Sequence, residues 1–222
     1  RMSMYFLQPM TAGQRKYIGC RAGAAIGSNI VAKRLYSTVN VQETTPSLWL
    51  TASEMAFCKA EGVLRGWNMG GGTAKEYYER GVTLSFNQWG ADGVVNYLLD
   101  DTSTEANYAD ALGGFGGAAA KASTITIKWD DNAPMDEKME RLITQKWIAL
   151  FPNGQEAWNE IRRTGYPRIF SVPQATNGYT LLTPNRIPFD KNQQINNRSN
   201  YDKAVELLGG PDDYATQMWW QR

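Results

Sequence analysis

Histidine is absent from this 222-residue chain, and cysteine occurs only twice. Without histidine the chain cannot build a Ser-His-Asp triad, a histidine general base or a histidine metal site. Cys20 and Cys58 match no metal-ligand spacing, and the sequence leaves a disulfide between them open. Cys58 lies on a helical face, where we expect a small core residue.

Long apolar runs are also missing. No stretch reaches the roughly 18–20 apolar residues that a membrane-spanning helix needs. No signal peptide or lipid-acceptor cysteine lies near the beginning, and residue 1 is an arginine. We therefore expect the chain to be part of a longer protein.

The chain also lacks an excess of charge of either sign, because it contains 23 basic and 22 acidic residues. This balance gives no support to a nucleic-acid partner. Aromatic residues, by contrast, are abundant, with eight Trp, eleven Tyr and seven Phe. They are numerous enough to supply both a core and exposed rings for a ligand.

Composition and periodicity divide the chain into five segments of one domain. They are a loop-rich segment at 1–50, a helical hairpin plus a short helix at 51–100, a connector at 101–134, a second helical hairpin at 135–168, and an irregular tail with short helices at 169–222.

The first hairpin begins with a capping-box pattern at Thr51 and Glu54, and the same spacing recurs at Thr73 and Glu76. Two helices joined by a short glycine-rich turn must pack antiparallel to bury their apolar faces. Glycines within the helices lower helix propensity, so we expect them to allow close helix–helix approach: Gly62, Gly66 and Gly81.

The second hairpin has an apolar stripe at every fourth position: Met139, Ile143, Trp147 and Phe151. Pro152 ends the first helix, and Asn153 is placed to cap the next one. We expect core positions for the tryptophans on helical faces and helix ends: Trp67, Trp89, Trp147 and Trp158. Charged residues between the apolar positions are expected on the surface. The two hairpins together predict an all-α fold of tetratricopeptide-like helical hairpins with long irregular loops.

A pair of carboxylates in the second hairpin raises the alternative of a glycosidase-like enzyme. Glu156 and Glu160 are one helical turn apart, but Arg162 and Arg163 follow closely, which is typical of solvated charge pairs on an exposed face. We therefore expect no catalytic residues and no cofactor or metal, and interpret the protein as a non-enzyme.

Three blocks of the sequence are distinctive: TASEMAFCKAEGVLRGW, GGTAKEYYERGVTLSFNQWG and, most specific of all, TQKWIALFPNGQEAWNEIRRTGYPR. They resemble helices of the SusD/RagB-like nutrient-binding outer-membrane lipoproteins, the first two corresponding to earlier helices of that family. The likeness extends over most of residues 1–222 and corresponds to the C-terminal portion of such a protein. Phe189 departs from the tyrosine more usual after the Arg-x-Pro motif. The family-signature positions with a structural role are Glu54, Glu61, Trp67, Trp89, Trp147, Phe151, Pro152, Asn153, Gly154, Trp158, Arg162, Arg163, Pro167, Arg186, Trp219 and Trp220.

The resemblance implies a role in nutrient uptake. Such proteins face the outside of the outer membrane, are anchored by a lipid in the N-terminal part, and pass an oligosaccharide to a SusC-like TonB-dependent transporter. A peptide ligand, as in RagB-type members, and a helical-repeat scaffold for protein partners remain as alternatives.

The resemblance identifies no ligand-contacting residue. Sugars require aromatic platforms and hydrogen-bonding groups, and loops offer these most readily. The ligand-binding residues expected on this basis are Tyr17, Arg21, Asn29, Tyr36, Phe115 and Trp129.

Overall fold

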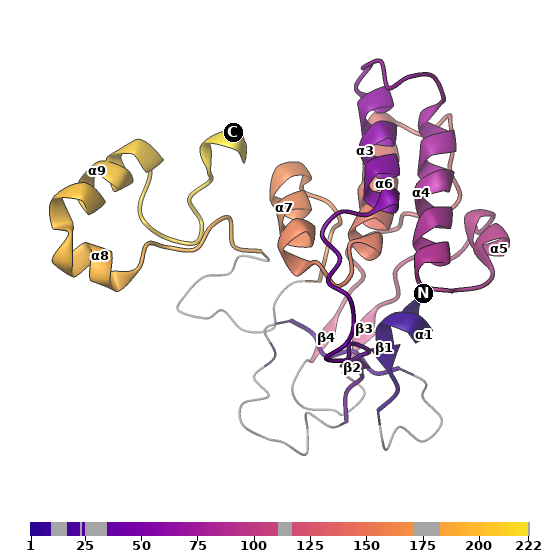
Figure 1. Ribbon diagram of the computed structural model, residues 1–222, viewed down its shortest axis with the longest axis horizontal. Helices are drawn as coiled ribbons and strands as arrows, with labels where there is room; N and C mark the ends of the chain where they lie inside the picture. Colours follow the sequence, from indigo (N-terminus) through magenta and orange to yellow (C-terminus); the bar gives the residue numbers. More distant parts are fainter. Residues whose placement is uncertain (10–16, 23, 25–34, 111–116, 171–182, 222) are drawn as a thin grey trace.

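The computed structural model describes residues 1–9, 17–22, 24, 35–110, 117–170 and 183–221 (Figure 1). These residues are mostly helical, which confirms the predicted fold class. The helices are α1 (Met2–Tyr5), α3 (Ala52–Leu64), α4 (Ala74–Gln88), α5 (Val94–Leu98), α6 (Met135–Ala149), α7 (Gly154–Thr164), α8 (Lys191–Asn196), α9 (Arg198–Leu208) and the 3-10 turn η1 (Trp219–Gln221). Four two-residue strands form two antiparallel pairs, β1 (Phe6–Leu7) with β2 (Thr38–Val39) and β3 (Tyr108–Ala109) with β4 (Ala118–Ala119).

Helices α3 and α4 form the first predicted hairpin. Thr51 accepts a hydrogen bond from the Glu54 backbone N–H, and Thr73 with Glu76 completes a reciprocal capping box. The predicted close approach occurs at Gly81, where a Cβ atom would lie 2.8 Å from the ring of Phe57. Because Gly81 has no side chain, α3 and α4 can approach closely and bury their apolar faces against each other.

Helix α6 packs against both members of this hairpin (Figure 1). The largest fully buried apolar side chains come from all three helices: Phe57, Tyr78, Val82, Leu142 and Ile143. The core therefore lies between α3, α4 and α6.

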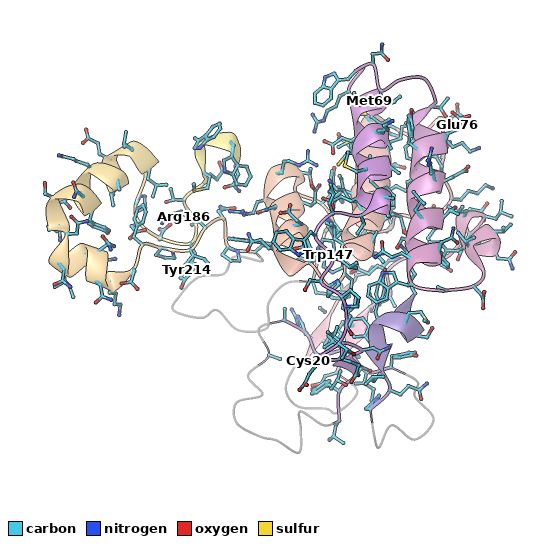
Figure 2. The ribbon with its side chains drawn as sticks, in the orientation of Figure 1. Cys20, Met69, Glu76, Trp147, Arg186 and Tyr214 are labelled. Carbon is cyan, nitrogen blue, oxygen red and sulfur yellow. The ribbon has the colours of Figure 1, made fainter. Side chains whose placement is uncertain are left out.

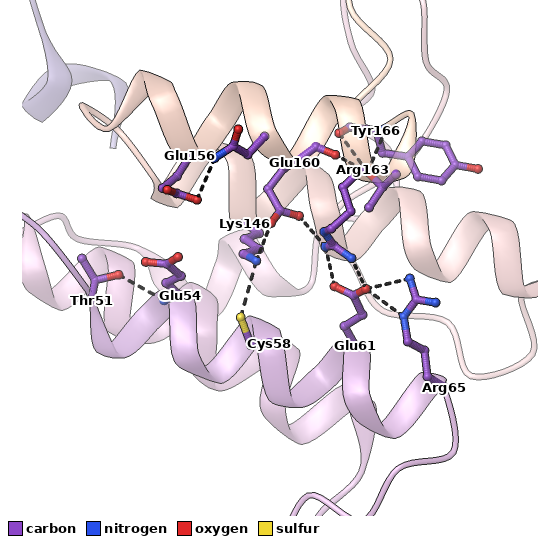
Figure 3. A network of polar contacts seen from close by, with 12 residues as sticks. Thr51, Glu54, Cys58, Glu61, Arg65, Lys146, Glu156, Glu160, Arg163 and Tyr166 are labelled. Carbon is purple, nitrogen blue, oxygen red and sulfur yellow. Dashed lines mark hydrogen bonds and ion pairs between the residues drawn. The ribbon is translucent and has the colours of Figure 1, made fainter. Parts of the chain in front are cut away.

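Charged residues of α6 and α7 are buried, where we expected a solvated surface. Lys146 and Glu160 lie inside the structure and pair at 2.8 Å, and Arg163 joins Glu160 at 2.7 Å and Glu61 at 2.6 Å (Figure 3). Arg65 closes the network at 2.8 Å from Glu61. The prediction failed because α7 and α3 cover this side of α6, and Lys146, Glu160 and Glu61 each have an oppositely charged partner there.

Trp67 and Trp147 do not occupy the predicted core positions. Trp67 is 62% exposed because α3 ends at Leu64 and the chain turns away at Gly66, whose φ is +79°. Trp147 is 37% exposed. An every-fourth-residue stripe rotates by about 40° per step around a helix, so the stripe that is buried at Ile143 has left the core by Trp147.

Trp89, Phe151 and Trp158 are half-buried. Trp89 and Phe151 pack around Tyr5 of α1, at centroid distances of 4.9 and 4.4 Å. This contact brings the N-terminal segment against the end of the helical layer.

Both cysteines are free and exposed, so Cys58 is not the core residue that we expected and no disulfide joins it to Cys20. The Cys58 thiol lies 3.5 Å from Lys146 Nζ at the edge of the buried charge network. This polar neighbour explains why the position is not part of the apolar core.

The tail is held to α7 by Arg162. Its guanidinium lies over the ring of Trp158 at 3.6 Å and over that of Trp220 at 4.8 Å, and it donates a hydrogen bond to the Asn185 carbonyl. Farther out, α8 and α9 form a separate pair (Figure 1). Asp212 anchors this pair by accepting hydrogen bonds from Arg186 and Tyr201.

Candidate functional site

A cleft of about 600 Å³ lies between α6 and the loops beneath the helical layer. We call it the α6 cleft. Figure 2 shows Trp147 at the lower end of the helices, above the loop layer that carries Cys20. The walls come from 19–22, 103–108, 123–127 and 167–170, and the floor from α5 and α6.

Four aromatic side chains from different segments line the α6 cleft. Tyr97 comes from α5, Trp147 from α6 and Tyr108 from β3, while Phe170 follows the second hairpin. The rings of Tyr108 and Phe170 lie 5.8 Å apart at an interplanar angle of 47°. Such rings offer apolar faces to a ligand.

Hydrogen-bonding groups accompany these rings. Gln145 accepts hydrogen bonds from the Tyr97 hydroxyl at 2.9 Å and from Arg1 at 2.5 Å, which fixes the Gln145 and Tyr97 side chains in the cleft lining. Thr144, Ser103 and Thr104 add hydroxyls to the lining. Apolar faces with a few polar groups are the general pattern of a small-molecule site.

Arg21 is the predicted ligand residue that the structure places in the α6 cleft. Its guanidinium donates a hydrogen bond to the Ala118 carbonyl at 3.0 Å, and its backbone N–H donates to the Tyr108 hydroxyl at 3.2 Å. Arg21 thereby ties the N-terminal loop to the β3–β4 pair. Its contact with a ligand stays a prediction.

Tyr36 lies buried in the loop layer, where its hydroxyl is 3.1 Å from both carboxylate oxygens of Asp110. Burial, followed by the hydrogen bond to Asp110, raises the pKa of Tyr36 well above its ordinary value. The phenol therefore stays protonated and donates to Asp110. This geometry suits a residue that supports the loops better than one that touches a ligand.

The other predicted ligand residues do not gather at the cleft. Trp129 is only 6% exposed and packs on Tyr78 in the helical core, so its ring offers no face to a ligand. Tyr17 is half-buried and is not part of the cleft lining. Asn29 and Phe115 lie outside the described residues.

The sequence-based reasoning missed most of the cleft. Tyr97, Tyr108, Phe170 and Arg168 were not singled out, because they lie in segments without periodicity. Trp147 was assigned to the core. One feature of the sequence could have predicted the position of Trp147. The apolar stripe of α6 rotates around the helix by about 40° with each four-residue step, which turns Trp147 away from the core.

A second, apolar groove of about 640 Å³ lies on the other side of Trp147. Tyr5, Phe6, Phe86 and Phe151 line it, with few polar groups among them. Its polar side chains are limited to a few residues such as Arg1, Asp92 and Asn153, so it offers a sugar fewer hydrogen-bonding partners than the α6 cleft does.

The described residues offer neither a metal cluster nor a membrane-spanning helix. No group of three or more acidic or cysteine side chains there lies close enough to hold a metal ion. Each helix in that part of the chain is also too short or too polar to cross a bilayer.

The chain belongs to the SusD-like family, because the family model described as "Susd and RagB outer membrane lipoprotein" matches residues 1–221. No curated protein matches the chain at a significant level.

Solved structures agree with this assignment. A SusD homologue from Bacteroides uniformis shares 40% sequence identity at a TM-score of 0.92, over 99% of this chain and 46% of its own. A SusD-like protein from Bacteroides thetaiotaomicron has 40% identity and a TM-score of 0.91, over 99% of this chain and 47% of its own. A chitin-binding SusD homologue from Flavobacterium johnsoniae has 38% identity and a TM-score of 0.87, over 98% and 45%. The chain thus spans about half the length of these relatives.

Proposed function

We propose that the protein binds an oligosaccharide in the α6 cleft and delivers it to a SusC-like TonB-dependent outer-membrane transporter. The observation that carries the proposal is the gathering of four aromatic rings beside Gln145, Thr144 and two arginines in one cleft. Sugar rings present apolar C–H faces and many hydroxyls, so they need both kinds of partner.

The family supports this proposal. Its members are described as outer-membrane lipoproteins, and one solved homologue is chitin-binding. By the same reasoning we place the whole protein at the cell surface, held by a lipid anchor outside the chain studied. A peptide ligand of the RagB type is the second candidate, favoured by the apolar groove on the far side of Trp147.

The positions of the carboxylates support binding of the sugar without its cleavage. Glu160 is buried between Lys146 and Arg163 and does not reach the α6 cleft. Glu105 lines the cleft, but one of its oxygens is engaged by the backbone N–H groups of Ala122 and Ser123. A glycosidase would need two such groups flanking the scissile bond.

Calorimetry with a panel of neutral and acidic oligosaccharides and of short peptides tests the proposal, with mass spectrometry of each ligand afterwards. We expect saturable binding of at least one oligosaccharide and its recovery intact. Binding of peptides alone would favour the second candidate, and shortened sugars would show an enzyme. Binding of neither class would leave a protein-interaction scaffold.

A further inference from the structure

Arg168 is the most accessible charged group of the α6 cleft. Its side chain is 56% exposed, and its nearest acidic partner is Glu140, at a long 3.5 Å. The guanidinium lies 5.9 Å from the centroid of the Tyr166 ring. Among the residues that the structure describes, Arg168 forms no other ion pair, and it belongs to the lining of the α6 cleft.

The negative groups near Arg168 already have partners. Glu105 Oε2 accepts hydrogen bonds from the backbone N–H groups of Ala122 at 2.6 Å and Ser123 at 2.9 Å. Glu140 Oε1 accepts a hydrogen bond from the Ser123 hydroxyl at 2.6 Å. Glu140 is buried, and one oxygen of Glu105 is held by backbone N–H groups, so neither carboxylate is as accessible as Arg168.

Arg21 is a second positively charged residue in the lining of the α6 cleft. It is buried in the cleft wall and donates to the Ala118 carbonyl. The charged residues that line the cleft are these two arginines and Glu105, so the lining itself is net positive, whereas Glu140, the partner of Arg168, is buried and does not line the cleft. A concave site with walls of low polarity strengthens the potential of such a lining.

We infer that the α6 cleft selects an anionic oligosaccharide, one that carries a carboxylate or a sulfate, and that Arg168 is the residue that recognises the anionic group. The inference rests on the proposed function and specifies its ligand class. The guanidinium fork donates two parallel hydrogen bonds to a carboxylate or sulfate, and the neighbouring rings cover the sugar faces. An uncharged sugar would leave the N–H groups of Arg168 to water.

The test measures the affinity of the protein for glucuronate-, galacturonate- and sulfate-bearing oligosaccharides. Each is paired with its own neutral form, which is carboxyl-reduced or desulfated. At low salt we expect an anionic member to bind at least about tenfold more tightly than its neutral form, as a charge-assisted hydrogen bond allows. Comparison of the uronate-bearing with the sulfate-bearing oligosaccharides shows which anionic group the cleft recognises. Salt should weaken the anionic ligand more than the neutral one.

Arg168→Gln should reduce this preference to about threefold or less, and Arg168→Lys should keep part of it because the charge remains. The matched control is Arg80→Gln, which removes an exposed arginine of α4 outside the α6 cleft. The control should leave the preference unchanged. An unchanged preference in Arg168→Gln would overturn the assignment of Arg168.

Failure of the inference is distinguishable from failure of the proposed function. If neutral oligosaccharides bind as tightly as their anionic forms, the proposed function stands and the charge selection is overturned. If no oligosaccharide of either kind binds, both are overturned. Binding of acidic peptides alone would also overturn both.

Discussion

At the residue scale, Gly81 decides how closely α3 and α4 approach. A methyl group there would meet three carbons of the Phe57 ring at 2.8–2.9 Å, which is closer than real side chains come. Phe57 is fully buried and cannot swing aside. The buried Ser53 hydroxyl also donates to the Gly81 carbonyl at 2.7 Å, which pins the two backbones at this spacing.

Replacing this glycine tests the contact. Gly81→Ala should lower the free energy of unfolding by about 1–3 kcal/mol, since overpacking costs more than the gain in helix propensity. The measurement is chemical denaturation followed by circular dichroism. Gly154→Ala is the matched control, because its Cβ would meet nothing within 4 Å. If Gly81→Ala is as stable as the control, the close approach does not constrain the hairpin.

Residue-level predictions from the sequence succeeded where the cause is local. The caps at Thr51 and Thr73 depend on side chains three residues apart, so spacing alone reveals them. Exposure of Trp67 and Trp147 depends on where a helix ends and which neighbour covers it. Those facts come from tertiary packing, and no local pattern contains them.

At the element scale, the charge network joins three helices that are far apart in the sequence. Glu61 comes from α3, Lys146 from α6, and Glu160 with Arg163 from α7 (Figure 3). A buried pair is not by itself strongly stabilising, but removing one partner leaves an uncompensated charge. The network therefore fixes the position of α7 against the other two helices.

Glu160→Gln should destabilise the protein by roughly 3 kcal/mol, because it leaves Lys146 buried without its anion. Glu156→Gln on the same helix is the control, since Glu156 is half-buried and forms no ion pair within the described residues. Thermal or urea unfolding of both variants provides the comparison. Equal stability of the two variants would show that the network contributes little.

The elements themselves were largely predictable, and their assembly was not. Repeats of apolar residues and the Pro152–Gly154 turn place α6 and α7 closely. The sequence did not reveal that Lys146 and Glu160 are buried. A charged residue is predicted to be exposed unless an oppositely charged partner is known, and this pair forms only in the folded structure. The α6 cleft was not predicted for a related reason. Its aromatic rings come from four segments that are distant in the sequence and become neighbours only in the folded structure.

At the scale of the whole molecule, the helices α3, α4 and α6 lie on one side and the loops with β1–β4 on the other (Figure 1). The α6 cleft lies between α6 and these loops. Two acidic anchors stabilise this arrangement. Burial alone would raise the pKa of Glu61, but its hydrogen bonds and ion pairs with Arg163 and Arg65 lower it overall, below 4.5. Burial would likewise raise the pKa of Asp212, but Arg186 together with hydrogen bonds from the Phe189 backbone and the Tyr201 hydroxyl lowers it overall.

These two carboxylates predict an acid-dependent stability. A lowered folded-state pKa contributes stability above the unfolded-state pKa, and that contribution is lost as the pH falls through the folded value. The free energy of unfolding should therefore decrease as the pH drops below about 4.5. Urea unfolding between neutral pH and about pH 3 measures it. Glu61→Gln should flatten the slope, whereas an unchanged slope would assign the effect to other carboxylates.

The central claim is that the ligand binds in the α6 cleft and contacts Trp147. The direct measurement is the affinity of Trp147→Ala for the oligosaccharide that the intact protein binds, beside Trp67→Ala, which removes an exposed tryptophan outside the cleft. We predict a loss of roughly tenfold or more in Trp147→Ala, as expected for a central aromatic contact. We predict no loss in Trp67→Ala, with both variants folded. Unchanged affinity in a folded Trp147→Ala protein would contradict the placement of the site.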